Sequence, residues 1–174
     1  MAFWKTIFGP AQADPKLQLV PLYTQIVAKA RQPHWYETGQ VPDSIDGRFD
    51  MIAALFSLVL LRLEQDEAQG GNMAHLTEVL VDDMDGQLRE VGIGDMIVGK
   101  HIGKIMGAVG GRITAFREAF ADKDRLDTAI IRNIYRGGDV DAAAIAHVRD
   151  GLVAIEQTLF RVTPDDLATG NASW

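Results

Sequence analysis

The chain has 174 residues and a mass of 19.1 kDa, which suits one domain with a well-buried core. Hydrophobic residues make up 47% and charged residues 24%, so the composition is that of a globular protein rather than a disordered one. The absence of cysteine excludes disulfide scaffolds, thiolate metal sites and cysteine nucleophiles. A formal net charge of −7 disfavours general nucleic-acid binding, because phosphate contacts need a basic face.

The apolar segments are too short to cross a membrane. The longest run, residues 51–61, has 11 residues, whereas a bilayer span needs about 18 or more. This run therefore predicts a buried helix. The first ten residues have neither the apolar core nor the cleavage site of a secretory signal. We expect a cytoplasmic protein and leave open a peripheral attachment at the cytoplasmic face of the inner membrane.

Apolar residues at helical spacing follow one another along the chain. The expected helices cover residues 15–31, 46–67, 73–91, 96–121, 123–136 and 141–162. Asp14 supplies an N-cap for the first of them, and Pro15 suits its first position. Residues 32–44 contain two prolines and a glycine and predict an ordered loop. Because no segment alternates apolar and polar residues, we expect an all-α fold, a single irregular helical bundle of about six helices.

Three parts of unequal size are expected. They are an N-terminal segment over residues 1–14, a single helical domain over 15–163 and a flexible polar tail over 164–174. In the N-terminal segment, one side of a short amphipathic helix would carry Phe3, Trp4, Ile7 and Phe8, with Lys5 opposite. This segment would either dock onto the domain or touch a membrane interface.

Charge is distributed unevenly. Residues 43–95 include 12 acidic and 3 basic side chains, whereas residues 96–117 include four basic and no acidic ones. Two interpretations are open. The basic helix packs beside the acidic ones, or it presents a basic surface to an acidic partner or to anionic lipid head groups.

Two motif matches are best explained by chance. Residues 94–100 fit the start of a phosphate-binding loop, but His101 replaces the required Ser or Thr and no strand precedes the match. Residues 82–86 resemble the start of an EF-hand loop, but its first and twelfth positions would be Val81 and Gly92, which are not calcium ligands. We therefore expect neither a nucleotide nor a calcium site.

No set of catalytic or metal-binding residues stands out. The four histidines are scattered, and His75 with Glu78 forms only one H-x-x-E pair, in the reverse order to the motif of di-iron bundles. None of the three serines lies in a nucleophile elbow. The sequence therefore predicts no enzyme, no metal and no cofactor.

The segment 96–121 contains a row of glycines. Gly99, Gly103, Gly107 and Gly111 recur at every fourth residue, and Gly110 adds a fifth. Each costs about 1 kcal/mol relative to alanine inside a helix, but together they leave a smooth strip that another helix backbone can approach closely. The strip would either pack against the 51–63 helix or receive a helix from a client protein.

Several ordered blocks carry a family resemblance. They are Trp35-Tyr36-Glu37, Val41-Pro42-Asp43, residues 46–51, residues 83–85, residues 88–95 and Val98-Gly99-Lys100. Over residues 17–121 the chain resembles the ubiquinol–cytochrome c chaperone family, in its alphaproteobacterial type. The resemblance implies an all-helical, non-enzymatic chaperone that holds newly made cytochrome b during assembly of the respiratory bc1 complex.

The same blocks supply the candidate binding residues. They are Trp35, Tyr36, Asp46, Arg48, Phe49, Asp50, Asp85, Arg89, Asp95, Gly99, Lys100, Gly103, Lys104 and Gly107. Arg48 can pair with the acids on either side of it, and the block either locks the 32–44 loop onto the bundle or contacts the client. Asp85, Arg89 and Asp95 with Lys100 would form a polar cluster that bridges the third and fourth helices.

These observations lead to one expected function and one alternative. We expect a chaperone whose partners are cytochrome b or other bc1 subunits, with a possible peripheral membrane contact and without a cofactor, nucleic acid or small-molecule substrate. The alternative is an intracellular helical adaptor or scaffold that uses an acidic face to bind a partner.

Overall fold

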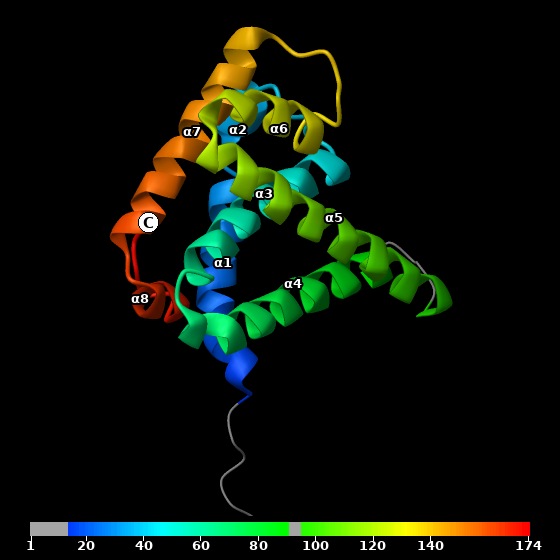
Figure 1. The fold of residues 1–174 in the computed structure, drawn as a ribbon. Helices are drawn as coiled ribbons and strands as arrows, with labels where there is room; N and C mark the ends of the chain where they lie inside the picture. Colours follow the sequence, from blue (N-terminus) through cyan, green and yellow to red (C-terminus); the bar gives the residue numbers. More distant parts are fainter. Residues whose placement is uncertain (1–13, 91–94) are drawn as a thin grey trace, which may run out of the picture.

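A computed structural model of the protein describes residues 14–90 and 95–174, and these residues contain helices and no strand (Figure 1). The prediction of an all-α bundle is therefore confirmed. The elements are η1 Pro15–Leu19, α1 Val20–Ala30, α2 Pro33–Glu37, α3 Ile45–Leu63, η2 Glu67–Gln69, α4 Gly70–Glu90, α5 Asp95–Ala121, η3 Lys123–Arg125, α6 Leu126–Asn133, α7 Ala142–Arg161 and α8 Pro164–Ala168. Within the described ranges, no helix is both long enough and apolar enough to cross a bilayer.

Helix α3 is the centre of the core. It begins where the Ser44 side chain accepts a hydrogen bond from the backbone N–H of Gly47 at 3.1 Å. All ten residues from Met51 to Leu60 are buried, as the long apolar run predicts. The hydroxyl of Ser57 donates to the carbonyl of Ala53 at 2.7 Å, which satisfies the polar group in this stretch. Helices α1, α5 and α7 pack around α3.

Helices α4 and α5 are the longest of the described elements, and they converge at one end, away from the rest of the bundle (Figure 1). Met84 is the last buried residue described in α4, and Val109 is the first in α5. The described parts of residues 85–90 and 95–108 therefore form a projection with no fully buried side chain. We call this projection the α4–α5 arm.

The segment between α1 and α3 is held by two aromatic residues. Trp35 is 1% exposed and its Nε1 donates to the carbonyl of Lys29 at 2.8 Å. The hydroxyl of Tyr36 donates to the carbonyl of Ala30, also at 2.8 Å. On α7, Gly151 leaves room for the indole, because an added Cβ would lie 2.5 Å from the Trp35 ring. The predicted ordered loop thus includes the short helix α2.

The C-terminal residues form part of the bundle, so the prediction of a flexible polar tail is wrong. The Thr163 side chain caps α8 by accepting a hydrogen bond from the N–H of Asp166 at 3.1 Å. Leu167 and Trp174 are buried, and burial of these apolar side chains stabilises the packed segment although its other residues are mostly polar. The expected N-terminal amphipathic helix falls almost wholly within residues 1–13, which lie outside the described residues.

Candidate functional site

Two of the candidate residues, Asp46 and Asp50, belong to an ion-pair cluster that is buried at Asp50 and exposed at Asp46. The Asp50 carboxylate is fully buried and accepts hydrogen bonds from Arg112 of α5 and from Nε of Arg136, the latter at 2.6 Å. Arg136 also bonds Asp46 at 2.8 Å. The two carboxylates from α3 thus bind α5 and the turn after α6 together, which is a positioning role.

Electrostatics in this cluster follow from burial and pairing. Burial lowers the pKa of the Arg112 guanidinium, and the charge of Asp50 opposes that shift. The hydrogen bond to Asp50 raises the pKa of Arg136. Arg112 also donates to the carbonyl of Asn133 at 3.0 Å and lies over the ring of Phe49, with 5.6 Å between the guanidinium carbon and the ring centroid. Phe49 is therefore half-buried beneath the cluster.

Arg48 has a different partner from the one expected. Its Nε bonds Asp43 at 2.6 Å on the exposed surface, and it pairs with neither Asp46 nor Asp50. The reason is the helix itself, since the side chains of Asp46 and Asp50 share the face that meets Arg136 and Arg112. Arg112 and Arg136 pair with these carboxylates in place of Arg48, and both are distant from them in the sequence.

Trp35 and Tyr36 also have separate roles. Trp35 faces the core, whereas Tyr36 is half-buried and lines a cavity of about 330 Å³. This cavity is lined by Arg31, Pro33, Tyr36, Glu37, Asp43 and Arg48. The structure thus brings Tyr36 and Arg48 together at the surface and removes Trp35 from it.

The predicted polar cluster on the α4–α5 arm is described only in part. Asp85 and Arg89 form an ion pair of 2.6 Å one helical turn apart on α4. The side chain of Asp95 lies outside the described ones. Lys100 is exposed and makes no ion pair with any side chain described. A bridge between the two helices through these residues stays a prediction.

The glycine row lies on an open face of α5. All five glycines are exposed, and a Cβ added at any of them would meet no neighbouring atom within 4 Å. Helix α5 packs against α3 with its opposite side, which carries Val109 and Phe116. The interpretation that the glycines allow tight packing against the 51–63 helix is therefore wrong. The exposed Lys100 and Lys104 border the strip on one side.

One further polar contact could not be predicted from spacing in the sequence. His34 of α2 and His147 of α7 share a hydrogen bond of 2.9 Å between Nδ1 and Nε2. Burial, and then the proximity of His147, lowers the pKa of His34. A sequence signal did exist for Arg112, since it is a charged residue within an apolar stripe. Among the described residues, no three histidine or acidic side chains converge as metal ligands.

The chain is similar to known proteins over most of its length. A family model described as ubiquinol–cytochrome C chaperone matches residues 37–174. A solved structure, the crystal structure of the Cbp3 homolog from Brucella abortus, is 29% identical with a TM-score of 0.78. That similarity covers 92% of this chain and 90% of the other. No curated protein matches the chain. Because the family model spans well over half of the sequence, the chain belongs to the ubiquinol–cytochrome c chaperone family.

Proposed function

We propose that this member of the family binds newly made cytochrome b while the bc1 complex, ubiquinol–cytochrome c reductase, is assembled. Membership of the ubiquinol–cytochrome c chaperone family supports a role in bc1 assembly in general. The observation that carries the finer proposal is the open row of glycines on α5. The proposal includes no catalytic step, no cofactor and no small-molecule substrate.

The glycine row has no use within the described fold. Each of its glycines costs about 1 kcal/mol relative to alanine in a helix, and no neighbouring atom requires the absence of a side chain. A bare strip of backbone allows a second helix to approach closely. A surface that accepts an apolar client helix therefore explains why α5 bears this cost.

The neighbours of the strip suit a client helix that emerges near a membrane. Ile102, Met106 and Ile113 are half-buried along one border, and Lys100 and Lys104 are exposed along the other. Apolar side chains can cover the client, and the two ammonium groups can face acidic groups or anionic lipid heads. We therefore propose that the protein works in the cytoplasm or at the cytoplasmic face of the inner membrane.

On this proposal, thirteen of the fourteen candidate residues divide into two groups, and the fourteenth, Asp95, has its side chain outside the described ones. Contact with the client is assigned to exposed positions of the α4–α5 arm, namely Gly99, Lys100, Gly103, Lys104 and Gly107, with Asp85 and Arg89 on the neighbouring helix. The exposed Arg48 and the half-buried Tyr36 beside it offer a second surface position. Trp35, Asp46, Phe49 and Asp50 instead position the helices of the bundle.

A leucine at the strip tests the proposal. The tagged protein and its Gly103→Leu variant are used to capture cytochrome b from detergent-solubilised cells, and mass spectrometry measures the recovery. Gly71→Leu is the matched control, because Gly71 is also exposed on a helix with open space around it but lies outside the arm. We expect the wild type and Gly71→Leu to recover cytochrome b, and Gly103→Leu to lose most of it.

Folding is measured in parallel by circular dichroism and urea denaturation. Since open space surrounds Gly103, the variant should be at least as stable as the wild type. If all three proteins recovered cytochrome b equally, the glycine strip would not be the binding surface. If the wild type recovered none, the proposed client would be wrong.

A further inference from the structure

Two histidines from distant parts of the chain meet where α2 packs against α7. Nδ1 of His34 and Nε2 of His147 are 2.9 Å apart and share a hydrogen bond. The planes of the two imidazole rings are inclined by 75°. Helices α2 and α7 lie away from the end where α4 and α5 converge (Figure 1), so this contact is separate from the glycine strip. We call the two residues the histidine pair.

A contact with Gln32 fixes which nitrogen of His34 carries the proton. Nε2 of His34 lies 3.1 Å from Oε1 of Gln32, and an amide oxygen can only accept a hydrogen bond. Nε2 therefore carries the proton, and Nδ1 of the neutral ring keeps a lone pair that faces His147. Burial lowers the pKa of His34, which favours this neutral form. A ring that donates through one nitrogen to an oxygen and offers the lone pair of the other has the arrangement of a metal-ligating histidine.

The separation of the two nitrogens matches that of two ligands on one metal ion. Nitrogens bound at about 2.0–2.1 Å, with roughly 90–110° between the two bonds, are themselves about 2.9–3.4 Å apart. The 2.9 Å between Nδ1 of His34 and Nε2 of His147 lies at the lower end of this range. The proton on Nε2 of His147 can move to Nδ1 of the same neutral ring. A change of tautomer and a small rotation of the rings thus free two lone pairs without the loss of a proton.

We propose that the histidine pair binds one divalent transition-metal ion through Nδ1 of His34 and Nε2 of His147. Imidazole suits zinc, copper and nickel, whereas calcium and magnesium take oxygen ligands. Both histidines are half-buried, so water can reach the ion and complete its coordination. Because the two ligands are 113 residues apart in the sequence, the ion joins α2 to α7.

The surrounding structure holds both ligands in place. The rings of His34 and Trp35 are in contact, with 4.1 Å between their centroids. Trp35 is itself buried and bonded to the carbonyl of Lys29, so the short helix that carries His34 is fixed. On α7, His147 precedes the fully buried Val148. Ligands on fixed elements lose little freedom when an ion binds, which supports a site that forms without refolding.

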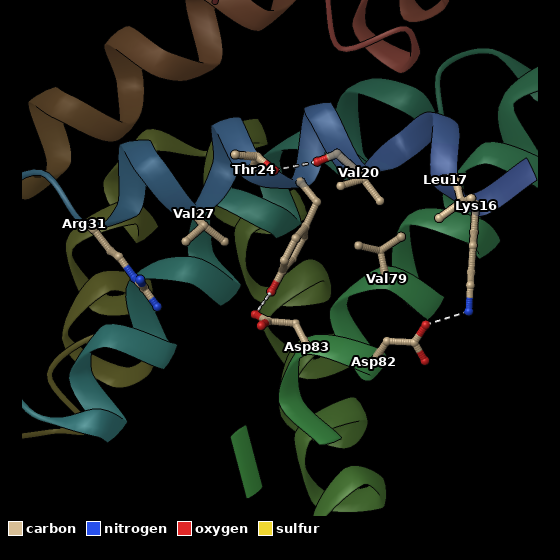
Figure 2. Close-up of a pocket in the computed structure, with 10 residues that line it drawn as sticks. Lys16, Leu17, Val20, Thr24, Val27, Arg31, Val79, Asp82 and Asp83 are labelled. Carbon is tan, nitrogen blue, oxygen red and sulfur yellow. Dashed lines mark hydrogen bonds and ion pairs between the residues drawn. The ribbon is translucent and has the colours of Figure 1, made fainter. Parts of the chain in front are cut away.

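A second group of potential cation ligands is directed to protein donors instead. Asp82 and Asp83 line a cavity of about 430 Å³ between η1–α1 and α4. Figure 2 shows the two carboxylates directed to different partners, Asp82 to Lys16 and Asp83 to the hydroxyl of Tyr23, each at 2.6 Å. Carboxylates that face different donors do not converge on one point. The structure therefore favours the histidine pair as the metal site.

Titration of the untagged full chain with metal ions tests the proposal. Isothermal titration calorimetry measures the affinity for Zn²⁺, Ni²⁺ and Cu²⁺, with Mg²⁺ as the comparison ion. We expect one Zn²⁺ per chain, tighter binding of Cu²⁺ and no binding of Mg²⁺. His34→Gln and His147→Gln should each weaken the binding of Zn²⁺ at least about tenfold. His75→Gln is the matched control, because His75 lies beside a potential second ligand, Glu78 at 3.4 Å, but outside the pair.

Nuclear magnetic resonance of the wild type identifies the ligand atoms without relying on the fold of a variant. Long-range ¹H–¹⁵N spectra follow the ring nitrogens, and spectra of His75→Gln and His101→Gln show by elimination which signals belong to the pair. Saturating Zn²⁺ should shift Nδ1 of His34 and Nε2 of His147 and place the proton of His147 on Nδ1.

Circular dichroism checks that the glutamine variants remain folded. Zn²⁺ affinity that stays the same in either His34→Gln or His147→Gln would overturn the proposal, as would a loss of binding in His75→Gln alone. An absence of Zn²⁺ binding at millimolar concentration would overturn it too. So would Zn²⁺-dependent shifts confined to the signals of His75 and His101.

Discussion

Asp50 shows how much one buried charge contributes to this fold. Its carboxylate has no contact with solvent and is bonded by the guanidinium groups of Arg112 and Arg136. Removing one partner of such a cluster leaves a buried charge uncompensated. We expect Asp50→Asn to lower the free energy of unfolding by about 3–5 kcal/mol. Urea denaturation at neutral pH measures the change.

Arg48→Met is the control for this prediction. Arg48 forms an exposed pair with Asp43, and exposed pairs contribute about 0–1 kcal/mol. A comparable loss of stability in both variants would contradict the positioning role of Asp50. It would indicate instead that the whole block from Asp43 to Asp50 is sensitive to any change.

At the scale of the helices, glycines in α5 and α7 occupy opposite environments. Gly107 has open space where a Cβ would lie, whereas a Cβ at Gly151 would come within 2.5 Å of the Trp35 ring. We expect Gly107→Ala to raise the free energy of unfolding by about 1 kcal/mol. Gly151→Ala should lower it by about 1–3 kcal/mol through overpacking. Urea denaturation of both variants checks the signs, and a loss of stability in Gly107→Ala would mean that the strip packs against the fold.

At the scale of the whole molecule, the His34–His147 bond joins the N-terminal and C-terminal halves of the bundle. Burial lowers the pKa of His34 below its ordinary value, so the unfolded state binds more protons than the native state as the pH falls. The contribution of this group to stability is therefore present above about pH 6.5 and is lost as the pH falls from there through the lowered pKa. Urea denaturation at about pH 7.5 and 5.5 should show this loss.

The comparison variant for the pH experiment is His34→Gln, which removes the imidazole whose pKa is lowered. We expect its stability to change less between the two pH values than that of the wild type. If the wild type and the variant had the same pH dependence, His34 would not link protonation to folding. The pH dependence of stability would then be assigned to the carboxylates.

The helices themselves were predictable because their causes are local. The 51–61 run of apolar residues predicts a buried helix, and α3 contains it. The end of that helix was less predictable. The expected helix reached residue 67, but α3 ends at Leu63, and the side chain of Asp66 caps the 3₁₀ turn that follows through the N–H of Ala68. A polar residue such as Asp66 can either continue a helix or cap the next turn, and packing decides between these two conformations.

The candidate site was predictable in composition but not in arrangement. The sequence predicts Asp46 and Asp50 as site residues, yet their partners Arg112 and Arg136 are more than 60 residues away along the chain. The glycines of α5 were identified as well, but the side of the helix that faces the core depends on where α3 lies. The prediction of a flexible tail is wrong because Leu167 and Trp174 find their apolar surroundings only in the folded bundle.

By itself, the sequence determined the helical class, the central buried helix and membership of the chaperone family. Helical hydrogen bonds and apolar periodicity connect residues within a few positions of one another, and the family blocks are contiguous stretches. Only the tertiary structure decided that Asp50 pairs with two distant arginines, that the glycine row is open and that the C-terminal residues are part of the bundle. These features depend on which helices become neighbours, and that is set by the burial of the whole core rather than by any one segment.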